Sequence, residues 1–192
     1  MTAITTPRRN ERSRRAILTA ALELLGETGY RDLTVEAIAA RAGVGKQTIY
    51  RWWRGKGAVI LEALVDSTVT DLALPDTGDL RADLRLVLRA TVAEFADPQL
   101  SATTRAITIE TLADDTLAEQ VRDQLLRPQL AAVRDRLRAG RAAGQVREGV
   151  DLDVAVELLF GPIYHRWLLR NGPLTEAYAD ELVDVALAAI GP

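Results

Sequence analysis

The sequence predicts an all-α protein in which a three-helix helix-turn-helix head precedes a larger helical body, with about nine helices in all. Apolar residues recur at spacings of three and four along most of the chain, the pattern of one helix face. Residues 34–53 indicate two short helices around a glycine turn, and the last two predicted helices are apolar on more than one face. We predict the head over residues 1–57, with a flexible arm at 1–9, and the body over residues 58–192.

The composition is that of a folded protein with a sizeable core. Of the 192 residues, 48 % are hydrophobic and 27 % are charged, which argues against disorder. The absence of cysteine excludes disulfides, thiolate metal ligands and cysteine nucleophiles. The N-terminal stretch lacks the apolar core of a signal peptide, and no apolar run approaches the ~20 residues of a membrane span. We therefore expect a soluble protein of the cytoplasm.

Charge is divided unevenly along the chain. Residues 1–60 hold eleven Lys or Arg and five Asp or Glu, a net charge of +6, whereas the whole chain has −3. The remaining residues therefore carry −9. A basic head on an acidic body is expected when one end of a protein meets phosphate, and it predicts salt-dependent binding. Ordinary solvated surface charge is the alternative explanation.

The first predicted helix, from Asn10 to Gly26, supplies core to the head. Its apolar residues return every three or four positions: Ile17, Ala20, Ala21, Leu24 and Leu25. Arginines around its start could follow a DNA backbone or enter a minor groove, or could only aid solubility. These are Arg8, Arg9, Arg12, Arg14 and Arg15.

Two short helices are predicted between Thr34 and Trp53. The hydroxyl of Thr34 can cap the first helix, and Gly43 can end it because glycine adopts a positive φ without a Cβ clash. Val44 and Ile49 then point back toward the first helix. Such a two-helix unit is a helix-turn-helix, whose second helix enters the major groove of DNA.

The outward residues of the second helix are polar or aromatic, which suits a nucleic-acid contact. The cations can neutralise phosphates, the amide and hydroxyl groups can address base edges, and the aromatic rings can pack on sugar or donate to phosphate. In that order the residues are Lys46 and Arg51, Gln47 and Thr48, and Tyr50 and Trp52. The alternative is an exposed polar helix of an ordinary bundle.

Six further helices are predicted, over residues 56–72, 79–96, 97–113, 114–143, 151–170 and 175–190. A turn at residues 74–78 separates the first two. Pro128 should kink the long helix because it lacks a backbone donor and crowds the preceding turn. The final two helices carry apolar residues on more than one face, and packing on one side would leave some of them exposed. We therefore expect these helices to pack against a second copy of the chain.

No pattern in the sequence indicates an enzyme. His165 is the single histidine, so a histidine-cluster metal site is excluded, and we expect it to pack or lie at an interface. Asp114 and Asp115 are adjacent, which directs them about 100° apart on a helix, and an N-cap explains them. No nucleophile elbow or phosphate loop occurs. We expect no cofactor and no metal.

The run from Gly29 to Leu64, GYRDLTVEAIAARAGVGKQTIYRWWRGKGAVILEAL, resembles the DNA-binding domain of the tetracycline-repressor (TetR) family of bacterial regulators. The shared features are Gly29–Tyr30, Ala37 and Ala40, Gly43–Val44, Thr48–Tyr50, and Lys56 at the start of the next helix. Residues around Gly161–Tyr164 and Trp167–Leu169 resemble one branch of the family's C-terminal domain. This resemblance implies a homodimeric regulator, usually a repressor, which binds a palindromic double-stranded operator and is released by a small-molecule effector.

The resemblance also implies roles for individual residues. Lys56 would contact the DNA backbone, completing a DNA-binding set of Thr34, Lys46, Gln47, Thr48, Tyr50, Arg51, Trp52 and Lys56. Helices between Val59 and Ala143 would enclose an effector pocket, for which Phe95, Arg105, Thr108 and Glu110 are candidates, although the polar ones could simply be exposed. The last two helices would form a four-helix dimer interface through Leu159, Ile163, Trp167 and Leu182.

Two residues depart from the family pattern. Gly55 stands where relatives commonly have a small polar cap, and Trp52 stands where many have histidine. The indole N–H of Trp52 could still donate to a phosphate. The main rival function is a helical ligand- or partner-binding protein that does not read DNA sequence, and selection of a preferred palindrome from random duplexes would separate the two.

Overall fold

The computed structural model describes residues 7–68 and 74–192. This described part of the chain forms ten α-helices and one short π-helical segment and holds no β-strand, which confirms the all-α prediction. The count exceeds the predicted nine because the long helix expected over 114–143 is divided into three pieces. Residues 1–6, in the predicted arm, and 69–73, at the predicted end of the helix over 56–72, lie outside the described residues.

The helices group into two compact units, each with its own core. Unit 1 comprises residues 1–70 and 102–125, and unit 2 comprises residues 71–101 and 126–192. The compact units assign the helix that follows Gly57 to unit 1, and the domain boundary between Gly57 and Ala58 stays a prediction. No helix of the described ranges is both long and apolar enough to cross a membrane.

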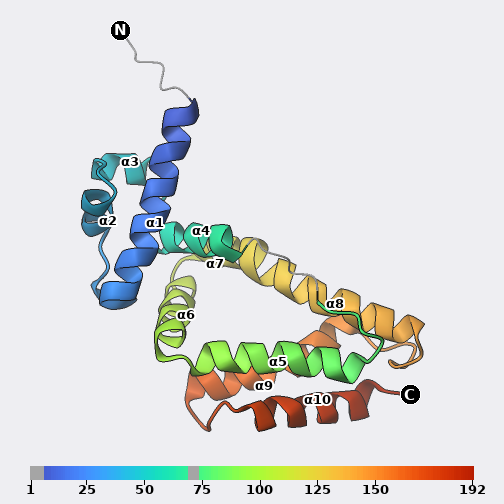
Figure 1. The fold of residues 1–192 in the computed structure, drawn as a ribbon. Coiled ribbons are helices and arrows are strands. Elements are labelled where there is room, and N and C mark those ends of the chain that lie inside the picture. The colour runs from blue at the N-terminus through green and yellow to red at the C-terminus, as the bar shows by residue number, and fades with distance from the viewer. Residues whose placement is uncertain (1–6, 69–73) are drawn as a thin grey trace. The chain divides into compact units, whose positions relative to one another are not determined.

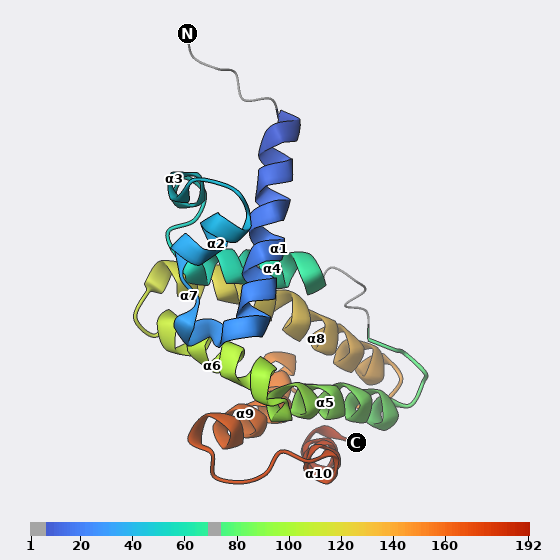
Figure 2. The ribbon, with the colours of Figure 1, turned by 60° about the vertical axis from the view of Figure 1, so that its left-hand side comes forward.

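Unit 1 is built on α1 (Pro7–Asp32), which packs against α2 (Val35–Arg41) and α4 (Lys56–Thr68). The five-residue α3 (Lys46–Tyr50) packs against α2, and both lie to one side of α1 in Figures 1 and 2. The later part of α6 (Pro98–Thr111) and α7 (Asp115–Val121) complete the unit. Its core holds Ile17, Ala21, Ile38, Ile49, Trp53, Val59 and Ile60.

The first helix is longer than the sequence predicts, and it contains a break. Gly26 does not end it; the chain stays helical to Gly29, which adopts φ 74° and ψ 168°, and helical turns resume to Asp32. A positive φ of this size suits glycine alone among common residues. The break leaves carbonyl groups at this end of α1 without helical donors.

Unit 2 is a bundle of α5 (Leu80–Ala96), α8 (Arg127–Ala142), α9 (Leu152–Leu169) and α10 (Glu176–Ile190). The α5 helix packs against α10 and α9, and Figure 1 draws it directly above them. Its core contains Leu84, Leu88, Val133, Leu137, Leu159, Ile163 and Val183. One ion pair is buried with these residues: Arg136 Nε donates to Asp83 Oδ2 at 2.7 Å, and Thr77 donates to the same carboxylate.

The predicted kink at Pro128 takes the form of a π-helical segment. Between α7 and α8, residues Arg122–Leu126 form a wider π turn, and Pro128 follows in the first turn of α8. Proline has no N–H to donate, and its ring crowds the carbonyl of the residue four positions earlier, Gln124. A wider turn at this point moves that carbonyl away from the ring.

Candidate nucleic-acid interface

The helix-turn-helix of unit 1 follows from three local features of its sequence. The Thr34 hydroxyl accepts from Ala37 N at 3.1 Å and caps α2, as expected for a threonine at this position. Gly43 takes φ 66° after the end of α2, which confirms the predicted glycine turn. Ile49, fully buried, fixes α3 against the rest of the unit.

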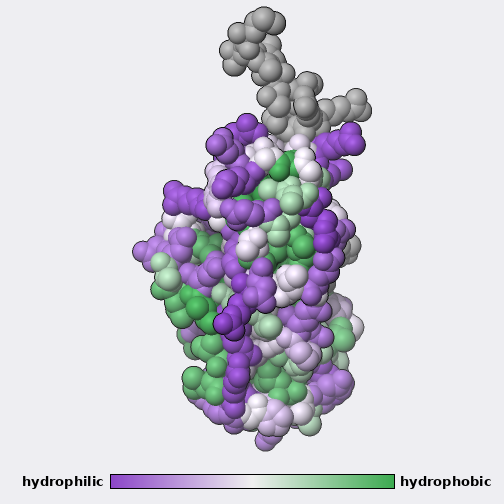
Figure 3. Space-filling model, turned by 90° about the vertical axis from the view of Figure 1, so that its left-hand side faces the viewer, coloured by the Kyte–Doolittle hydropathy of each residue, from purple (hydrophilic) through white to green (hydrophobic). Residues whose placement is uncertain are grey.

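The side chains predicted to meet DNA lie mostly on the outside of α3. Lys46, Gln47, Tyr50 and Arg51 are exposed, whereas Thr48 and Trp52 are half-buried. The exposed Lys46 makes one long ion pair to Glu36, at 3.7 Å, and Thr34 is also exposed at the start of α2. Figure 3 views the side on which α2 and α3 lie, and hydrophilic groups cover much of this part of the chain. The arrangement provides cations, amide and hydroxyl groups on one small helix, as phosphate and base-edge contacts require.

Lys56 has an internal role that the sequence analysis missed. Its ammonium donates to Tyr30 O at 2.9 Å and Leu33 O at 3.1 Å, and lies 4.6 Å from the centre of the Tyr30 ring. A cation at the first residue of α4 is unfavourable for that helix, but it satisfies carbonyls at the negative end of α1. A phosphate contact of Lys56 stays a prediction.

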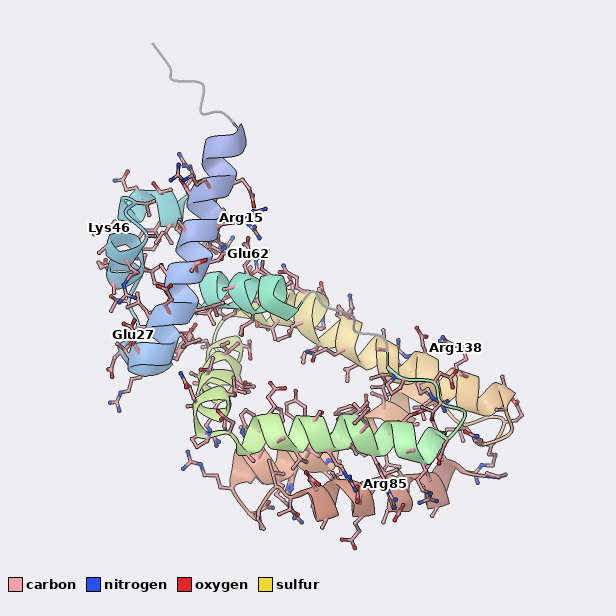
Figure 4. The ribbon with its side chains drawn as sticks, in the orientation of Figure 1. Arg15, Glu27, Lys46, Glu62, Arg85 and Arg138 are labelled. Atoms are coloured by element: carbon pink, nitrogen blue, oxygen red, sulfur yellow. The ribbon has the colours of Figure 1, made fainter. Side chains whose placement is uncertain are left out.

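A carboxylate on α4 connects three parts of the head. Glu62 Oε2 accepts from the indole Nε1 of Trp53 at 2.6 Å, and its Oε1 accepts from Arg14 Nε at 2.5 Å. Arg14 also donates to Asp66 and Glu11. Figure 4 shows Glu62 on α4 beside α1. Arg14 is one of the arginines predicted as possible DNA contacts, but its guanidinium is directed to carboxylates of its own unit.

The two neighbouring tryptophans have different surroundings. Trp53 is buried in the core of unit 1, while Trp52 is half-buried beside it, with ring centres 5.4 Å apart. The guanidinium of Arg51 lies 5.9 Å from the Trp52 ring centre. Trp53 therefore anchors the segment after α3, and Trp52 extends the surface that α3 presents.

Two exposed acids on α1 hold α2 through Arg41. Its guanidinium donates to both oxygens of Glu27, at 2.9 and 2.8 Å, and to Glu23 at 3.4 Å. Hydrogen bonding to Glu27 raises the pKa of Arg41, and the same bond lowers the pKa of Glu27. Because the pair is exposed, its contribution to stability is small and screened by salt.

A cavity of about 380 Å³ lies within unit 1, next to the segment that follows α3. Its lining includes Trp52, Trp53, Gly57, Glu62, Glu110 and Gln120. At Gly57, α4 comes so close to its neighbours that a Cβ would collide with the Glu110 carboxylate and lie 3.1 Å from Leu117. Burial raises the pKa of the nearby Tyr30 phenol, and the Glu110 carboxylate raises it further.

Two family models match these two parts of the chain. The model of "Bacterial regulatory proteins, tetR family" matches residues 17–63, and that of the "Tetracyclin repressor-like, C-terminal domain" matches residues 74–186, more than half of the protein. The chain belongs to the tetR family of bacterial regulatory proteins. The resemblance predicted from the sequence is thereby confirmed.

Individual relatives agree with this assignment. The chain is 35 % identical over 176 residues to YdeS, an uncharacterized HTH-type transcriptional regulator of Bacillus subtilis (strain 168), covering 91 % of this chain and 88 % of that one. It is 33 % identical over 192 residues to the DNA-binding transcriptional repressor TetR of Mycobacteroides abscessus, covering 96 % and 97 %. A crystal structure of a TetR family transcription regulator matches with TM-score 0.80 and 36 % identity, covering 94 % and 99 %. The protein is a DNA-binding transcriptional regulator of the helix-turn-helix type.

Of the four residues predicted for the effector pocket of this TetR-family regulator, Glu110 alone is among those lining the cavity in unit 1. Thr108 lies on α6 of the same unit, where its hydroxyl donates to Thr104 O, and Arg105 is half-buried on that helix. Phe95 belongs to unit 2 and is buried, stacked on Trp167 with ring centres 4.7 Å apart. The structure therefore gives Phe95 a core role.

The residues predicted for the dimer interface differ in how deeply unit 2 buries them. Leu159, Ile163 and Trp167 are buried in the core of unit 2, and the Trp167 indole donates to Ser101 Oγ at 2.7 Å. They face the core of their own unit from the inward side of α9, and their part in a dimer interface stays a prediction. Leu182, on α10, is half-buried. The sequence showed that α9 is apolar on more than one face but not which face each residue occupies.

The outward face of α9 carries a different stripe. Its exposed members recur at spacings of four, three, four and three, so they lie along one side of the helix: Val154, Leu158, Gly161, His165 and Leu168. On α10, Val185 is also exposed, at 58 %. These residues are available to a second protomer of the TetR-family regulator, and His165 lies among them.

Proposed function

We propose that this protein is a dimeric repressor that binds a palindromic DNA operator through the α3 helix of each protomer and is released by a small-molecule effector. The observation that carries the proposal is the outward face of α3, where polar groups surround a single buried anchor, Ile49. This face combines cations with amide and aromatic groups on one short helix, the set that contacts with phosphates and base edges require. We place the protein in the cytoplasm, where such operators lie.

The proposed division of labour follows the chemistry of each side chain. Lys46 and Arg51 neutralise phosphates, which contributes salt-dependent affinity for any duplex. Gln47 and Thr48 address base edges in the major groove and contribute sequence preference. Tyr50 and Trp52 pack against the sugar-phosphate backbone or donate to it, and Thr34 approaches the backbone from the start of α2. Lys56, held by carbonyls of α1, buttresses the head and can reach phosphate only by leaving them.

Dimerisation is proposed through the outward stripe of α9 together with α10. Val154, Leu158 and Leu168 are apolar and exposed, at 59 %, 39 % and 47 %. Exposed apolar residues that cluster on one helix face indicate an association surface, whereas apolar residues scattered singly over a surface do not. A two-fold interface here would pair each protomer's stripe with the same stripe of its partner, and two heads could then bind two half-sites of a palindrome.

The effector site is proposed to be the cavity of unit 1. It combines the indole rings of Trp52 and Trp53 with a largely polar lining that includes Glu110 and Gln120, groups that could orient a polar ligand. The names of two solved relatives support a small-molecule effector: the "Flavonoid-responsive Regulator FrrA" and the "SmeT-Triclosan complex", each 26 % identical, with TM-scores of 0.66 and 0.63. A ligand that binds more tightly to a conformation in which the two DNA-binding heads are mis-spaced would shift the population away from the DNA-competent conformation.

The proposed function is tested by selection from a random duplex library with the purified chain. A palindrome whose half-sites are separated by about one helical turn is the expected result. The Tyr50→Ala variant, altered at an exposed position, serves as the matched control and should enrich the same palindrome poorly. Enrichment of no common sequence by the wild-type chain would refute operator reading and favour a helical partner-binding protein.

A further inference from the structure

We propose that Glu62 is a positioning residue for sequence recognition: through Trp53 it sets the orientation of α3, and so separates operator from other DNA. Glu62 touches no DNA in this proposal and acts entirely through the indole of Trp53. The inference rests on the proposed function, because it concerns how the recognition helix is held while it reads bases.

The recognition helix has few means of holding itself in place. It spans five residues, Lys46–Tyr50, and its N-cap, Gly45, offers no side-chain hydrogen bond. Helices this short are unstable in isolation, so their orientation depends on the neighbouring structure. Ile49 anchors the inner face of α3, and α2 supports it along one side. A single buried residue fixes a position but leaves rotation about that point weakly restrained.

Trp53 supplies a second anchor one turn later. Its backbone N–H donates to Ile49 O at 2.9 Å, so it continues the last turn of the α3 segment. Its ring is buried, with 5 % of its surface exposed, and its Nε1 donates to Glu62 Oε2 at 2.6 Å. Two anchors on one short segment, Ile49 and Trp53, fix its direction as well as its position.

Glu62 is itself held, which makes it a suitable fixed point. Its other carboxylate oxygen accepts from Arg14 of α1 at 2.5 Å, and Arg14 also pairs with Asp66, one turn further along α4. The carboxylate therefore joins α1, α4 and the recognition segment in one chain of hydrogen bonds. A hydrogen bond that involves a charged group is stronger and more directional than one between neutral groups.

The consequence concerns specificity more than affinity. Phosphate contacts tolerate a few degrees of tilt, because Lys and Arg side chains are long and flexible. Hydrogen bonds to base edges need donor and acceptor aligned, and they carry the sequence information. Releasing Trp53 from Glu62 should therefore weaken operator binding while leaving binding to unrelated duplex nearly unchanged.

The test measures the ratio of dissociation constants for random-sequence duplex and for the selected operator, at one salt concentration. Trp53→Phe removes the indole donor and keeps an aromatic ring, and Glu62→Ala removes the acceptor. Each should lower the ratio about tenfold, and the double variant should lower it no further, because both changes break the same bond. Asp66→Asn is the matched control: it removes the charge of a carboxylate that pairs with Arg14 and does not touch Trp53, and the ratio should stay within about twofold of wild type.

A conservative variant separates positioning from general support of the fold. Glu62→Gln keeps an oxygen that can accept from Trp53 and should restore the ratio to within about threefold of wild type. Indole N–H resonances provide the structural readout, since the chain has three tryptophans and Trp53→Phe identifies one of the three signals. The chemical shift of the Trp53 indole N–H should change in Glu62→Ala and stay at its wild-type value in Asp66→Asn.

The outcomes distinguish this inference from the proposed function. If the wild-type chain selects no operator, the proposed function fails. If it selects one, but Trp53→Phe and Glu62→Ala keep the wild-type ratio, the positioning role is overturned. Equal loss of the ratio in Asp66→Asn, or losses that track melting temperature across all variants, would also overturn it, because a purely structural role predicts those results.

Discussion

The helices α3 and α9 both expose side chains that their own units do not need, but the two sets differ in chemistry. Around one buried isoleucine, α3 exposes Lys46, Gln47, Tyr50 and Arg51. Opposite a fully buried face, α9 exposes an apolar stripe. The difference is the basis of the two proposals: a charged, hydrated polymer as the partner of α3 and a second apolar surface as the partner of α9. In both helices the inner face packs in the core of its own unit, and the outer face is the one proposed for association.

The largest expected effect comes from the inner face of α9. Leu159→Ala empties a fully buried position, so we expect a loss of about 2–5 kcal/mol in the free energy of unfolding. Chemical denaturation should show this loss at every protein concentration. Leu158→Ala, its neighbour on the outer face, is the control and should cost little in a dilute sample. Equal losses at both positions would contradict the assignment of faces.

The outer face of α9 is tested by charge. Leu158→Glu combined with Leu168→Glu would bury carboxylates against the partner's stripe, and we expect the dimer to weaken by about 100-fold or more. Sedimentation velocity should show monomers whose far-ultraviolet circular dichroism matches wild type. A dimer that persists unchanged would move the interface away from this stripe.

A smaller effect, on operator affinity, is expected from substitutions on the outer face of α3. Lys46→Ala and Tyr50→Ala should each weaken operator binding about tenfold, since each removes one exposed group, a change of ~1.4 kcal/mol. Titrations across a salt series should show a shallower slope for Lys46→Ala than for Tyr50→Ala, because lysine displaces a counterion. Melting temperatures should stay at the wild-type value. Unaltered operator affinity in both variants would remove α3 from the interface.

The smallest expected effect is on the pH dependence of unfolding, and it distinguishes a buried carboxylate from an exposed one. Burial opposes ionisation of Asp83, but hydrogen bonds from Thr77 and Arg136 outweigh it, so the pKa of Asp83 is lowered. A lowered pKa stabilises the folded state above the unfolded value, near 3.9, and this stabilisation is lost as the pH falls through the folded pKa. Unfolding between about pH 5 and 2 should therefore depend less steeply on pH in Asp83→Asn.

Glu27→Gln is the control for that measurement. The pKa of Glu27 is also lowered, through Arg41, but the pair is exposed and screened. The contribution of Glu27 to the pH dependence of unfolding should be smaller than that of Asp83. Added salt should reduce the Glu27 contribution further, whereas the Asp83 contribution should persist. If the two variants showed the same salt sensitivity, the contrast between buried and exposed pairs would not hold.

Much of the fold follows from local sequence patterns. Thr34 caps α2 and Gly43 takes a positive φ, because both depend on residues only a few positions apart. The outward set of α3 was predictable for the same reason, since the spacing of Val44 and Ile49 defines the inner side. The functional residue that spacing could not show is Glu62, which lies nine positions after Trp53 and 48 after Arg14.

By itself, therefore, the sequence determined the all-α class, the helix-turn-helix and the family, because these depend on periodicity, caps and a contiguous motif. Only the tertiary structure decided which apolar face of α9 is inside. Both faces satisfy the same periodicity, and the choice depends on how α5, α8 and α10 pack against them. The structure also decided that Lys56 and Arg14 bind groups of their own unit, because long cationic side chains reach partners that are distant in sequence.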